Sequence, residues 1–315
     1  MNYKIYKLNF TSPLHLGNGK LSDHEYHLYA DTLFSAMCIE ARQSYGMNEL
    51  DTLVEAVKNN KLRISDGMPF YSGDDDIYMI PKPMMQIETD EIDYNLKKKY
   101  KKLKYIDITK VDEFVRGKMD LSIEDIQKNI GIADFRNLVS VHEEKDAEPY
   151  KVGTYTFNQG YGLYIIIGYE DDEIKYLVED ILVGLECSGI GGKRNIGLGR
   201  FNLKNPPNTK NMLDSLNLTL RDNLKTDKKL ISLSISLPND DELEKVIDKA
   251  AYTLVKRSGF TDGSFSAGNL IRKNDFYAIA AGAVFEKGFE GVLKNVVKDY
   301  VHPVYKYAKP IFMEV

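Results

Sequence analysis

Apolar and polar residues alternate over the first ten residues of the chain, and this period of two predicts a strand from Met1 to Phe10. Apolar residues then recur every three or four positions from Leu33 to Ala41, which predicts a helix with Asp31 as its N-cap. A second stripe of the same kind predicts a helix over 48–59, and a short apolar run predicts a strand over 77–80. The chain therefore begins with a strand that is followed by helices.

The pattern changes between about Gln86 and Tyr150, where charged residues dominate and the apolar period weakens. The segment 94–104 reads YNLKKKYKKLK, with six lysines in eleven residues. These lysines could follow RNA phosphates while Tyr94, Tyr100 and Tyr105 stack on bases, whereas the ordinary explanation is a solvated helix face or a loop. We interpret 86–150 as an insertion that projects from a compact domain.

After the insertion the apolar pattern resumes. Strands are expected at 153–157 and 163–167, and the Asn-Gln-Gly turn at 158–160 between them predicts a hairpin. A helix over about 174–185 follows, then a glycine-rich loop, and then a short strand near 198–203.

The second half opens with a linker at 205–208, which reads Asn-Pro-Pro-Asn. Strict alternation over 230–237 predicts a strand, and Asn239 is expected to cap a helix over 242–257. The inward face of this helix should contain Leu243, Val246, Ile247, Ala250 and Leu254. Short strands and a terminal segment at 305–315 complete the half.

Each half of the chain thus begins with a strand and then a helix, as a βαββαβ unit does. We predict an α+β fold of two ferredoxin-like (RRM-like) halves packed together, with glycine-rich loops. The N-terminal domain should cover 1–205, with the long insertion at about 86–150, and the C-terminal domain 206–315. A chain of 315 residues is long enough for two such domains.

The composition excludes several classes of protein. With 42 basic and 47 acidic residues the net charge is −5, so any contact with nucleic acid must be local. The two cysteines, Cys38 and Cys187, lack the spacing of a structural zinc site or of a disulfide framework. There is no signal-peptide pattern and no apolar run of membrane-spanning length. We therefore predict a cytoplasmic protein with no metal, no cofactor and no membrane contact.

The glycine-rich loop is the clearest candidate for chemistry. Ser188 to Phe201 reads SGIGGKRNIGLGRF, with five glycines in the twelve residues from Ser188 to Gly199. Glycines allow close approach of the backbone, so main-chain N–H groups could form an anion site that Lys193, Arg194 and Arg200 reinforce. The alternative is a helix-to-strand connection whose glycines serve tight packing. Walker and dinucleotide loops are excluded, because both need a strand before the glycines.

The segment GGKRNIGLGRF, placed after a helix, resembles the signature loop of the RAMP superfamily of CRISPR proteins. Two further segments resemble one group within it: TSPLHLGNGKLSDHEYHLYADTLFSAMC at 11–38 and HPVYKYAKPIFMEV at 302–315. Together the three resemble the fourth subunit of the type III-A (Csm) effector, the group that caps the 5′ tag of the guide RNA. The resemblance extends over both halves and is weakest in the insertion.

The resemblance implies a non-catalytic subunit that binds the repeat-derived 5′ tag of the crRNA. It implies contacts with the large polymerase-containing subunit and the backbone RAMP subunit, and with target RNA only indirectly. It also implies that the insertion holds a hairpin-like thumb that displaces a guide base. RNA contact is carried onto the positions that match the loop, which are Gly189, Gly191, Gly192, Lys193, Arg194, Asn195, Gly197 and Gly199.

Further candidates for RNA contact are Arg200, His15, Arg257 and Lys273. A second glycine-bearing loop, Ser258-Gly259-Phe260 with Asp262-Gly263-Ser264, could line the same groove as the first. A rival interpretation is a repeat-RNA-processing endoribonuclease of the same superfamily, with His15 as its general acid or base. A third is a single-strand RNA binder unconnected with CRISPR. We predict no catalytic residue.

Overall fold

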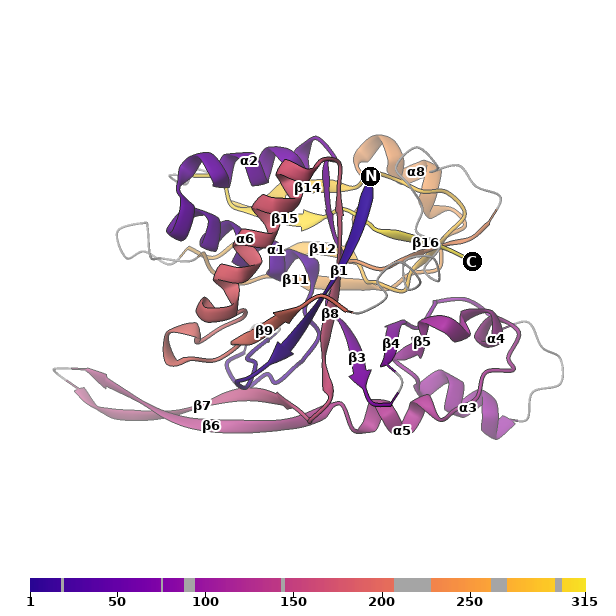
Figure 1. The fold of residues 1–315 in the computed structure, drawn as a ribbon, viewed down its shortest axis with the longest axis horizontal. Helices are drawn as coiled ribbons and strands as arrows, with labels where there is room; N and C mark the ends of the chain where they lie inside the picture. Colours follow the sequence, from indigo (N-terminus) through magenta and orange to yellow (C-terminus); the bar gives the residue numbers. More distant parts are fainter. Residues whose placement is uncertain are drawn as a thin grey trace.

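The computed structural model describes residues 1–17, 20–74, 76–87, 94–142, 145–206, 228–261, 271–297 and 302–315. Its largest element is an antiparallel sheet around β1, which pairs with β8 on one side and β9 on the other (Figure 1). The strands of this sheet are β1 (Asn2–Phe10), β2 (Leu62–Ile64), β3 (Met68–Ser72), β4 (Asp76–Pro81), β5 (Tyr105–Asp107), β8 (Tyr161–Tyr169) and β9 (Phe201–Lys204). The strands predicted over 1–10 and 77–80 are confirmed.

β8 lies in the middle of this sheet and is buried on both faces. Leu163, Ile165 and Ile167 pack into the core on one face, while Tyr164 and Ile166 pack into the core on the other. Successive side chains of a strand point to opposite faces, so a strand covered on both sides reads as a continuous apolar run. This explains why the segment does not alternate as β1 does.

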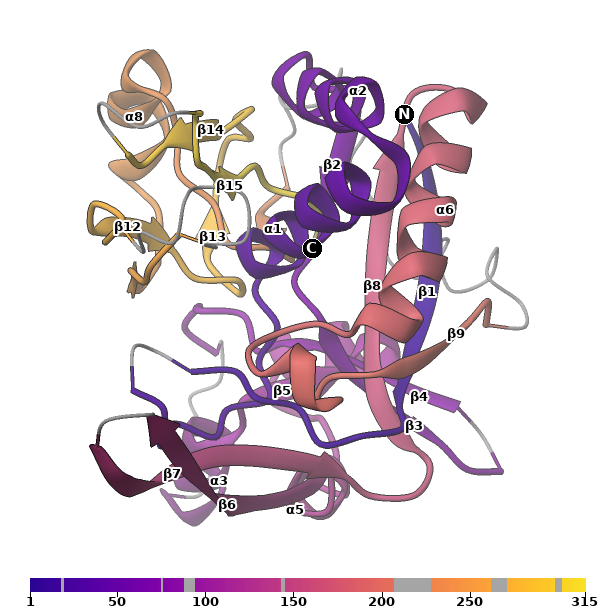
Figure 2. The same cartoon turned by 90° about the vertical axis from the view of Figure 1, so that its left-hand side faces the viewer.

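Three helices cover one face of the sheet: α1 (Ala30–Glu40), α2 (Met47–Lys58) and α6 (Asp172–Ser188). A π-helical turn, Ala41–Tyr45, joins the first two. Figure 2 shows α1 between α6 on one side and the strands of the second half on the other. The three helices predicted in this half are confirmed.

Asp31 is not the N-cap of α1, contrary to the prediction. The helix begins at Ala30 with Tyr29 at the N-cap, and the N–H of Ala30 donates to Oδ1 of Asp66 at 2.8 Å. Asp31 lies fully buried in the first turn and pairs with cations of the second half. An acidic residue before an apolar stripe is a common cap signal, and a pairing with remote segments gives no local signal.

The predicted insertion contains two different parts. α3 (Tyr94–Lys102), a 3-10 turn (Ile108–Lys110), α4 (Val111–Val115) and α5 (Ile123–Lys128) pack with β5 at the edge of the sheet. The second part is a long hairpin of β6 (Gly131–His142) and β7 (Lys145–Phe157). This hairpin projects from the body of the molecule (Figure 1).

The hairpin predicted from 153–157 and 163–167 is wrong. The first segment belongs to β7, which pairs with β6, and the second belongs to β8, which pairs with β1. The turn between them redirects the chain instead: the N–H of Asn158 donates to the carbonyl of Ile130, and Gly160 takes a φ of +84°. Pairing with remote strands therefore overrides the local turn signal.

The described part of the second half contains one helix and three small antiparallel sheets. The helix is α8 (Asp240–Ile247), and the sheets are β10 (Leu230–Ser232) with β13 (Val284–Phe285) and β16 (Phe312–Glu314), β11 (Leu254–Arg257) with β12 (Phe276–Ile279), and β14 (Val292–Asn295) with β15 (Tyr305–Ala308).

Two predicted elements of this half are shorter than expected. Asn239 caps α8 as predicted, since its side chain accepts the N–H of Glu242 at 2.9 Å. The helix nevertheless ends at Ile247, and Leu254 lies in β11, 54% exposed, because this segment pairs with β12. The strand predicted over 230–237 ends at Ser232, whose hydroxyl donates to the carbonyl of Ser234 at 2.7 Å.

Helices packed on antiparallel sheets agree with the predicted α+β class. The ferredoxin-like character of both halves and the boundary at 205–206 remain predictions, and Pro207 and Asn208 of the expected linker lie outside the described residues. Within the described ranges, no helix is long and apolar enough to cross a membrane.

Candidate RNA interface

A groove of about 960 Å³ brings together three segments that are far apart in the sequence. One wall is the loop from His15 to His27, the second is the glycine-rich loop at 191–195, and the third is the segment from Arg257 to Phe260. The exposed side of α1 lies between them and contributes Thr32 and Ser35. We call this cavity the groove.

Most of the predicted site residues line this groove, and the others lie elsewhere. Those in the groove are His15, Gly191, Gly192, Lys193, Arg194, Asn195 and Arg257. Gly189 and Gly199 are buried at the base of the glycine-rich loop, Gly197 and Arg200 do not line the groove, and Lys273 lines a second cavity.

The base of the glycine-rich loop is closed by contacts within the protein. The N–H of Ile190 donates to the carbonyl of Gly199 at 3.0 Å, and a Cβ at Gly199 would collide with the carbonyl of Ile190. A Cβ at Gly189 would lie 2.6 Å from the carbonyl of Leu198. The tight-packing interpretation therefore holds for these two glycines, which let the two ends of the loop touch.

The centre of the loop packs against the loop that contains His15. The N–H of Gly192 donates to the carbonyl of His15 at 2.9 Å, and a Cβ at Gly192 would lie 2.6 Å from the imidazole ring. The amides of Ile190 and Gly192 are thus already bonded, so the predicted cradle of successive N–H groups is not present at 189–192. The cationic side chains next to them, Lys193 and Arg194, remain the candidate phosphate ligands of the loop.

Lys193 is fixed by the projecting hairpin. Its backbone adopts a left-handed conformation with φ of +59°. Its Nζ lies 3.1 Å from the hydroxyl of Tyr150 and 4.9 Å from the centre of that ring. A cation held over an aromatic face is attracted by the ring, so its position is restrained. The contact places the tip of Lys193 between the groove and β7.

His15 is held as a packing residue. It is 8% exposed, and its Nδ1 lies 2.7 Å from the carbonyl of Gly153 in β7. Because a carbonyl can only accept, Nδ1 carries the hydrogen and Nε2 is an acceptor in the neutral ring. His27 is bonded separately, to the hydroxyl of Tyr105 at 2.9 Å and to Asp66 at 3.0 Å.

The third histidine of this loop, His24, contacts the projecting hairpin. The ring of His24 lies edge-on to Phe135, at 5.3 Å between centroids. Among the described residues, no group of three or more His, Cys, Asp or Glu side chains is arranged to hold a metal ion.

Arg257 reaches the groove from β11 and is fixed by three groups. Its Nε lies 3.2 Å from both oxygens of Asp31, and its Nη2 donates to Oγ1 of Thr32 at 2.8 Å. The guanidinium carbon lies 4.1 Å from the centre of the Tyr29 ring. Arg257 is thus held at the groove wall in one orientation.

Lys306 of β15 is the second cation on Asp31, with Nζ 2.5 Å from Oδ2. Burial alone raises the pKa of Asp31, but the attraction of Lys306 and Arg257 outweighs it and holds the pKa of that carboxyl well below its usual range. The carboxylate therefore joins α1 to two strands of the second half.

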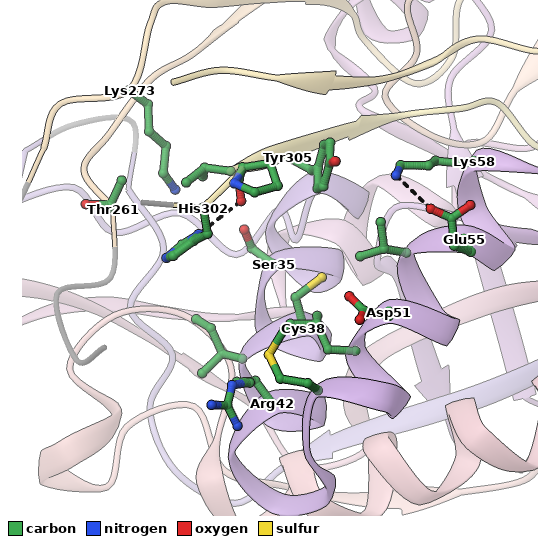
Figure 3. A pocket seen from close by; sticks show the side chains of 16 residues that line it. Ser35, Cys38, Arg42, Asp51, Glu55, Lys58, Thr261, Lys273, His302 and Tyr305 are labelled. Atoms are coloured by element: carbon green, nitrogen blue, oxygen red, sulfur yellow. Dashed lines mark hydrogen bonds and ion pairs between the residues drawn. The ribbon is translucent and has the colours of Figure 1, made fainter. Parts of the chain in front are cut away.

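Lys273 lines a separate cavity of about 660 Å³ rather than the groove. Figure 3 shows Lys273, Thr261 and His302 on one side of this cavity, Lys58 and Glu55 on the other, and Cys38 between them. Burial raises the pKa of the Cys38 thiol to about 12. Asp262, Gly263 and Ser264, predicted to line the groove, lie outside the described residues.

The lysine run is exposed: five of its six lysines lie on α3 and Lys104 lies just after it, in agreement with the ordinary explanation of a solvated helix face. Tyr100 is 2% exposed and its hydroxyl donates to the carbonyl of Met119 at 2.6 Å, while Tyr105 is also buried. These two rings cannot stack on RNA bases, so that part of the prediction is wrong. The side chain of Tyr94 lies outside the described residues.

Sequence reasoning missed Tyr29, Asp31 and Tyr150, which fix the cations, and Lys306, the second cation on Asp31. One signal was available for Asp31. It stands three residues before Phe34, on the buried stripe of α1, where a carboxylate requires a partner. Nothing in the sequence identified that partner.

Comparison with known proteins begins with the sequence. The family model described as "CRISPR Csm4 C-terminal domain" matches residues 225–315. The chain is 33% identical to "CRISPR system Cms protein Csm4" of Mycobacterium tuberculosis (strain ATCC 25618 / H37Rv), over 99% of this chain and 98% of that protein. It is 31% identical to the protein of the same name from Streptococcus thermophilus, over 100% and 99% of the two chains.

Two solved structures have a similar fold. A chain in the crystal structure of the Csm3-Csm4 subcomplex in the type III-A CRISPR-Cas interference complex matches with a TM-score of 0.64, 20% identity and 99% coverage of each chain. A chain of the Csm1-Csm4 cassette in complex with AMPPNP matches with a TM-score of 0.60 and 19% identity, over 100% of this chain and 98% of that one.

The sequence matches thus define a protein of a CRISPR system. More specifically, the chain belongs to the Csm4 family. The resemblance inferred from the three sequence segments is confirmed.

Proposed function

We propose that this chain is a crRNA-binding subunit of a type III-A CRISPR interference complex and that it holds the 5′ tag of the crRNA in the groove. The observation that carries the proposal is the convergence of the glycine-rich loop, the loop containing His15 and Arg257 on one cavity. Membership of the Csm4 family supports the assignment to a CRISPR complex.

The groove has the chemistry of a phosphodiester site. Lys20, Lys193, Arg194 and Arg257 line it, against Glu25 as the acidic lining residue. Charge-assisted bonds from lysine and arginine to phosphate oxygens are strong and independent of base sequence. The RNA contacts are therefore mainly to phosphate and sugar, as expected for a subunit that holds a constant tag.

The sheet order of the first half supports a ferredoxin-like unit there. Its strands run β9, β1, β8, β3, with α1 after β1 and α6 after β8, as in a βαββαβ unit. The β6–β7 hairpin is the thumb in this proposal. Contacts with the large polymerase-containing subunit and the backbone RAMP subunit follow from the Csm1 and Csm3 chains named in the two similar structures.

The proposed role is non-catalytic and cytoplasmic. His15 is nearly buried, and its Nδ1 is committed to Gly153, which suits packing better than acid-base chemistry. Target RNA reaches the chain only through the crRNA. The rival, a repeat-RNA endoribonuclease, requires cleavage of repeat RNA by the isolated protein and its loss in His15→Ala.

The test is the double variant Lys193→Ala with Arg194→Ala, co-expressed with the other subunits and a repeat-spacer array. We expect reduced crRNA retention in the purified complex, and for the single chain a salt slope of RNA binding lower by about 0.7 per lost phosphate contact. Lys245→Ala with Lys249→Ala is the matched control, since Lys245 is exposed on α8, Lys249 is exposed in the turn after it, and neither lines the groove. A complex that keeps full-length crRNA with the loop variant contradicts the proposal.

A further inference from the structure

Asp31 has a role that its helix does not require. The first free amide of α1, that of Ala30, is already capped by Asp66 at 2.8 Å, and the side chain of Asp31 makes no cap bond. A carboxylate that is fully buried and not needed as a cap is costly, because it loses its hydration. Some other contact must compensate for that cost.

The compensating contacts come from the second half of the chain. Arg257 of β11 and Lys306 of β15 both contact Asp31, with Nη2 3.1 Å from Oδ1 and Nζ 2.5 Å from Oδ2. Burying such an ion cluster gives little net stability compared with apolar packing, but its geometry is strict. The cluster therefore fixes the position of the two strands relative to α1.

Arg257 is the member of this cluster that lines the groove. Its guanidinium carbon lies over the Tyr29 ring, and its N–H groups donate to Thr32 and Asp31. A planar group fixed in this way loses little rotamer freedom when it meets a phosphate, and lysine has no planar group that could make the same contacts. The groove wall from Arg257 to Phe260 is thus built from the second half but held by the first.

We propose that Asp31 is a positioning residue for RNA: it holds Arg257 at the groove wall, so that the groove is complete only when β11 and β15 are docked on α1. The inference rests on the proposed RNA-binding function. It adds a residue that touches no RNA and couples the docking of the two halves to binding of the guide.

Two variants of the full chain test the idea with a labelled crRNA that carries the repeat-derived tag. The first is a double variant that keeps the local net charge, which we call the charge-matched variant. Asp31→Asn with Lys306→Met removes one negative and one positive charge, so the local net charge is unchanged while the ion pair that holds Arg257 is removed. Arg257→Ala removes the wall residue itself. We expect each to weaken binding about tenfold. The triple variant combines Asp31→Asn, Lys306→Met and Arg257→Ala. It should bind RNA no more weakly than Arg257→Ala alone, because loss of the ion pair and loss of Arg257 act through the same side chain.

Thr32→Val is the variant that leaves all three buried charges in place, and it should weaken RNA binding about threefold through the lost bond to Arg257. Thermal unfolding of each variant shows whether the fold is kept. If the charge-matched variant does not fold, wild-type affinity in Thr32→Val overturns the inference. Additive losses in the triple variant also overturn it, since they indicate two independent effects.

Failure of this inference differs from failure of the proposed function. If the wild type binds the crRNA and Lys193→Ala with Arg194→Ala weakens it, the function stands. Wild-type affinity in the charge-matched variant or in Arg257→Ala then refutes only the role of Asp31. A wild-type chain that does not bind the crRNA refutes both.

Discussion

Two cationic regions of this protein hold their charges in opposite ways. On α3 the lysines are exposed and the helix is anchored by buried Tyr100. In the groove the cations are fewer, but Arg257 is fixed by Asp31 and Lys193 by Tyr150. An exposed lysine loses up to about 2 kcal/mol of rotamer freedom when it is fixed on a ligand, and a side chain already fixed loses less. Fixed geometry, more than the number of lysines, thus favours the groove as the RNA site.

The largest effect is expected at the ion cluster behind the groove. Asp31→Ala leaves Arg257 and Lys306 buried without their carboxylate, so the free energy of unfolding should fall by about 3–5 kcal/mol. Lys98→Ala on α3 is the control and should change it by less than about 0.5 kcal/mol, because that side chain is exposed. Urea unfolding at neutral pH measures both. If Asp31→Ala and Lys98→Ala lowered the free energy of unfolding equally, the proposed difference between the two cationic regions would be wrong.

Acid should remove part of the same stabilisation. The pKa of Asp31 is lower in the folded chain than in the unfolded one, because Lys306 and Arg257 outweigh the effect of burial. The contribution of the ionised carboxylate is therefore complete above the unfolded value of about 3.9 and is lost as the pH falls toward the folded value.

The measurement is the difference in unfolding free energy between the wild type and Asp31→Asn as the pH is lowered. We expect it to shrink below about pH 4, where the unfolded wild type takes up the proton first. The comparison of wild type with Lys98→Ala should stay flat over the same range. A difference for Asp31→Asn that stays constant down to about pH 3 would show that the carboxylate is not held in its charged form.

The sequence was informative where the pattern is local. The helices α1, α2 and α6, the strand β1 and the cap at Asn239 follow from apolar period and capping residues. The glycine-rich loop could be located as well. The groups with which the loop could bind phosphate could not be predicted, because the amide of Gly192 is bonded to the carbonyl of His15, which is far away in the sequence.

Contacts between remote segments explain the errors. Leu254 was placed in a helix and lies in a strand, because its partner is β12. Asp31 was read as a cap because its partners, Arg257 and Lys306, lie in the second half. Lys273 and Arg257 looked equivalent in the sequence, yet they line different cavities. A single sequence does not show such pairings, so the members of the site could be proposed but not its geometry.

Gly197 and Gly199 of the glycine-rich loop differ in how closely their backbone is approached by other atoms, and substituting them should have effects of intermediate size. Gly199 has a φ of +75° and its Cβ would collide with the carbonyl of Ile190, whereas Gly197 has a φ of +84° and its Cβ would meet only Arg200, at 4.0 Å. Gly197→Ala should therefore cost about 1 kcal/mol, for the backbone conformation alone. Gly199→Ala should cost about 2–3 kcal/mol, because a backbone collision is added.

Thermal unfolding of the two glycine variants shows whether Gly199→Ala loses more stability than Gly197→Ala. The crRNA affinity of each variant is the second measurement. Gly199→Ala should also weaken binding, since separating the ends of the loop shifts Lys193 and Arg194 away from the groove. If Gly197→Ala is the more harmful of the two, the ends of the loop are not held by the contact between Ile190 and Gly199.

The smallest effect is expected on α3, and it decides whether exposed lysines matter. Lys98→Ala with Lys99→Ala should leave crRNA affinity and its salt slope unchanged, because neither side chain lines the groove and Tyr100 next to them is buried. If the lysine run followed phosphates, each lost contact would lower the salt slope by about 0.7, or about 1.4 for the pair. Titration at several salt concentrations separates the two outcomes, with Lys193→Ala and Arg194→Ala as the positive control. A slope that falls equally in both pairs would mean that the number of cations, and not their fixation by Asp31 and Tyr150, governs binding.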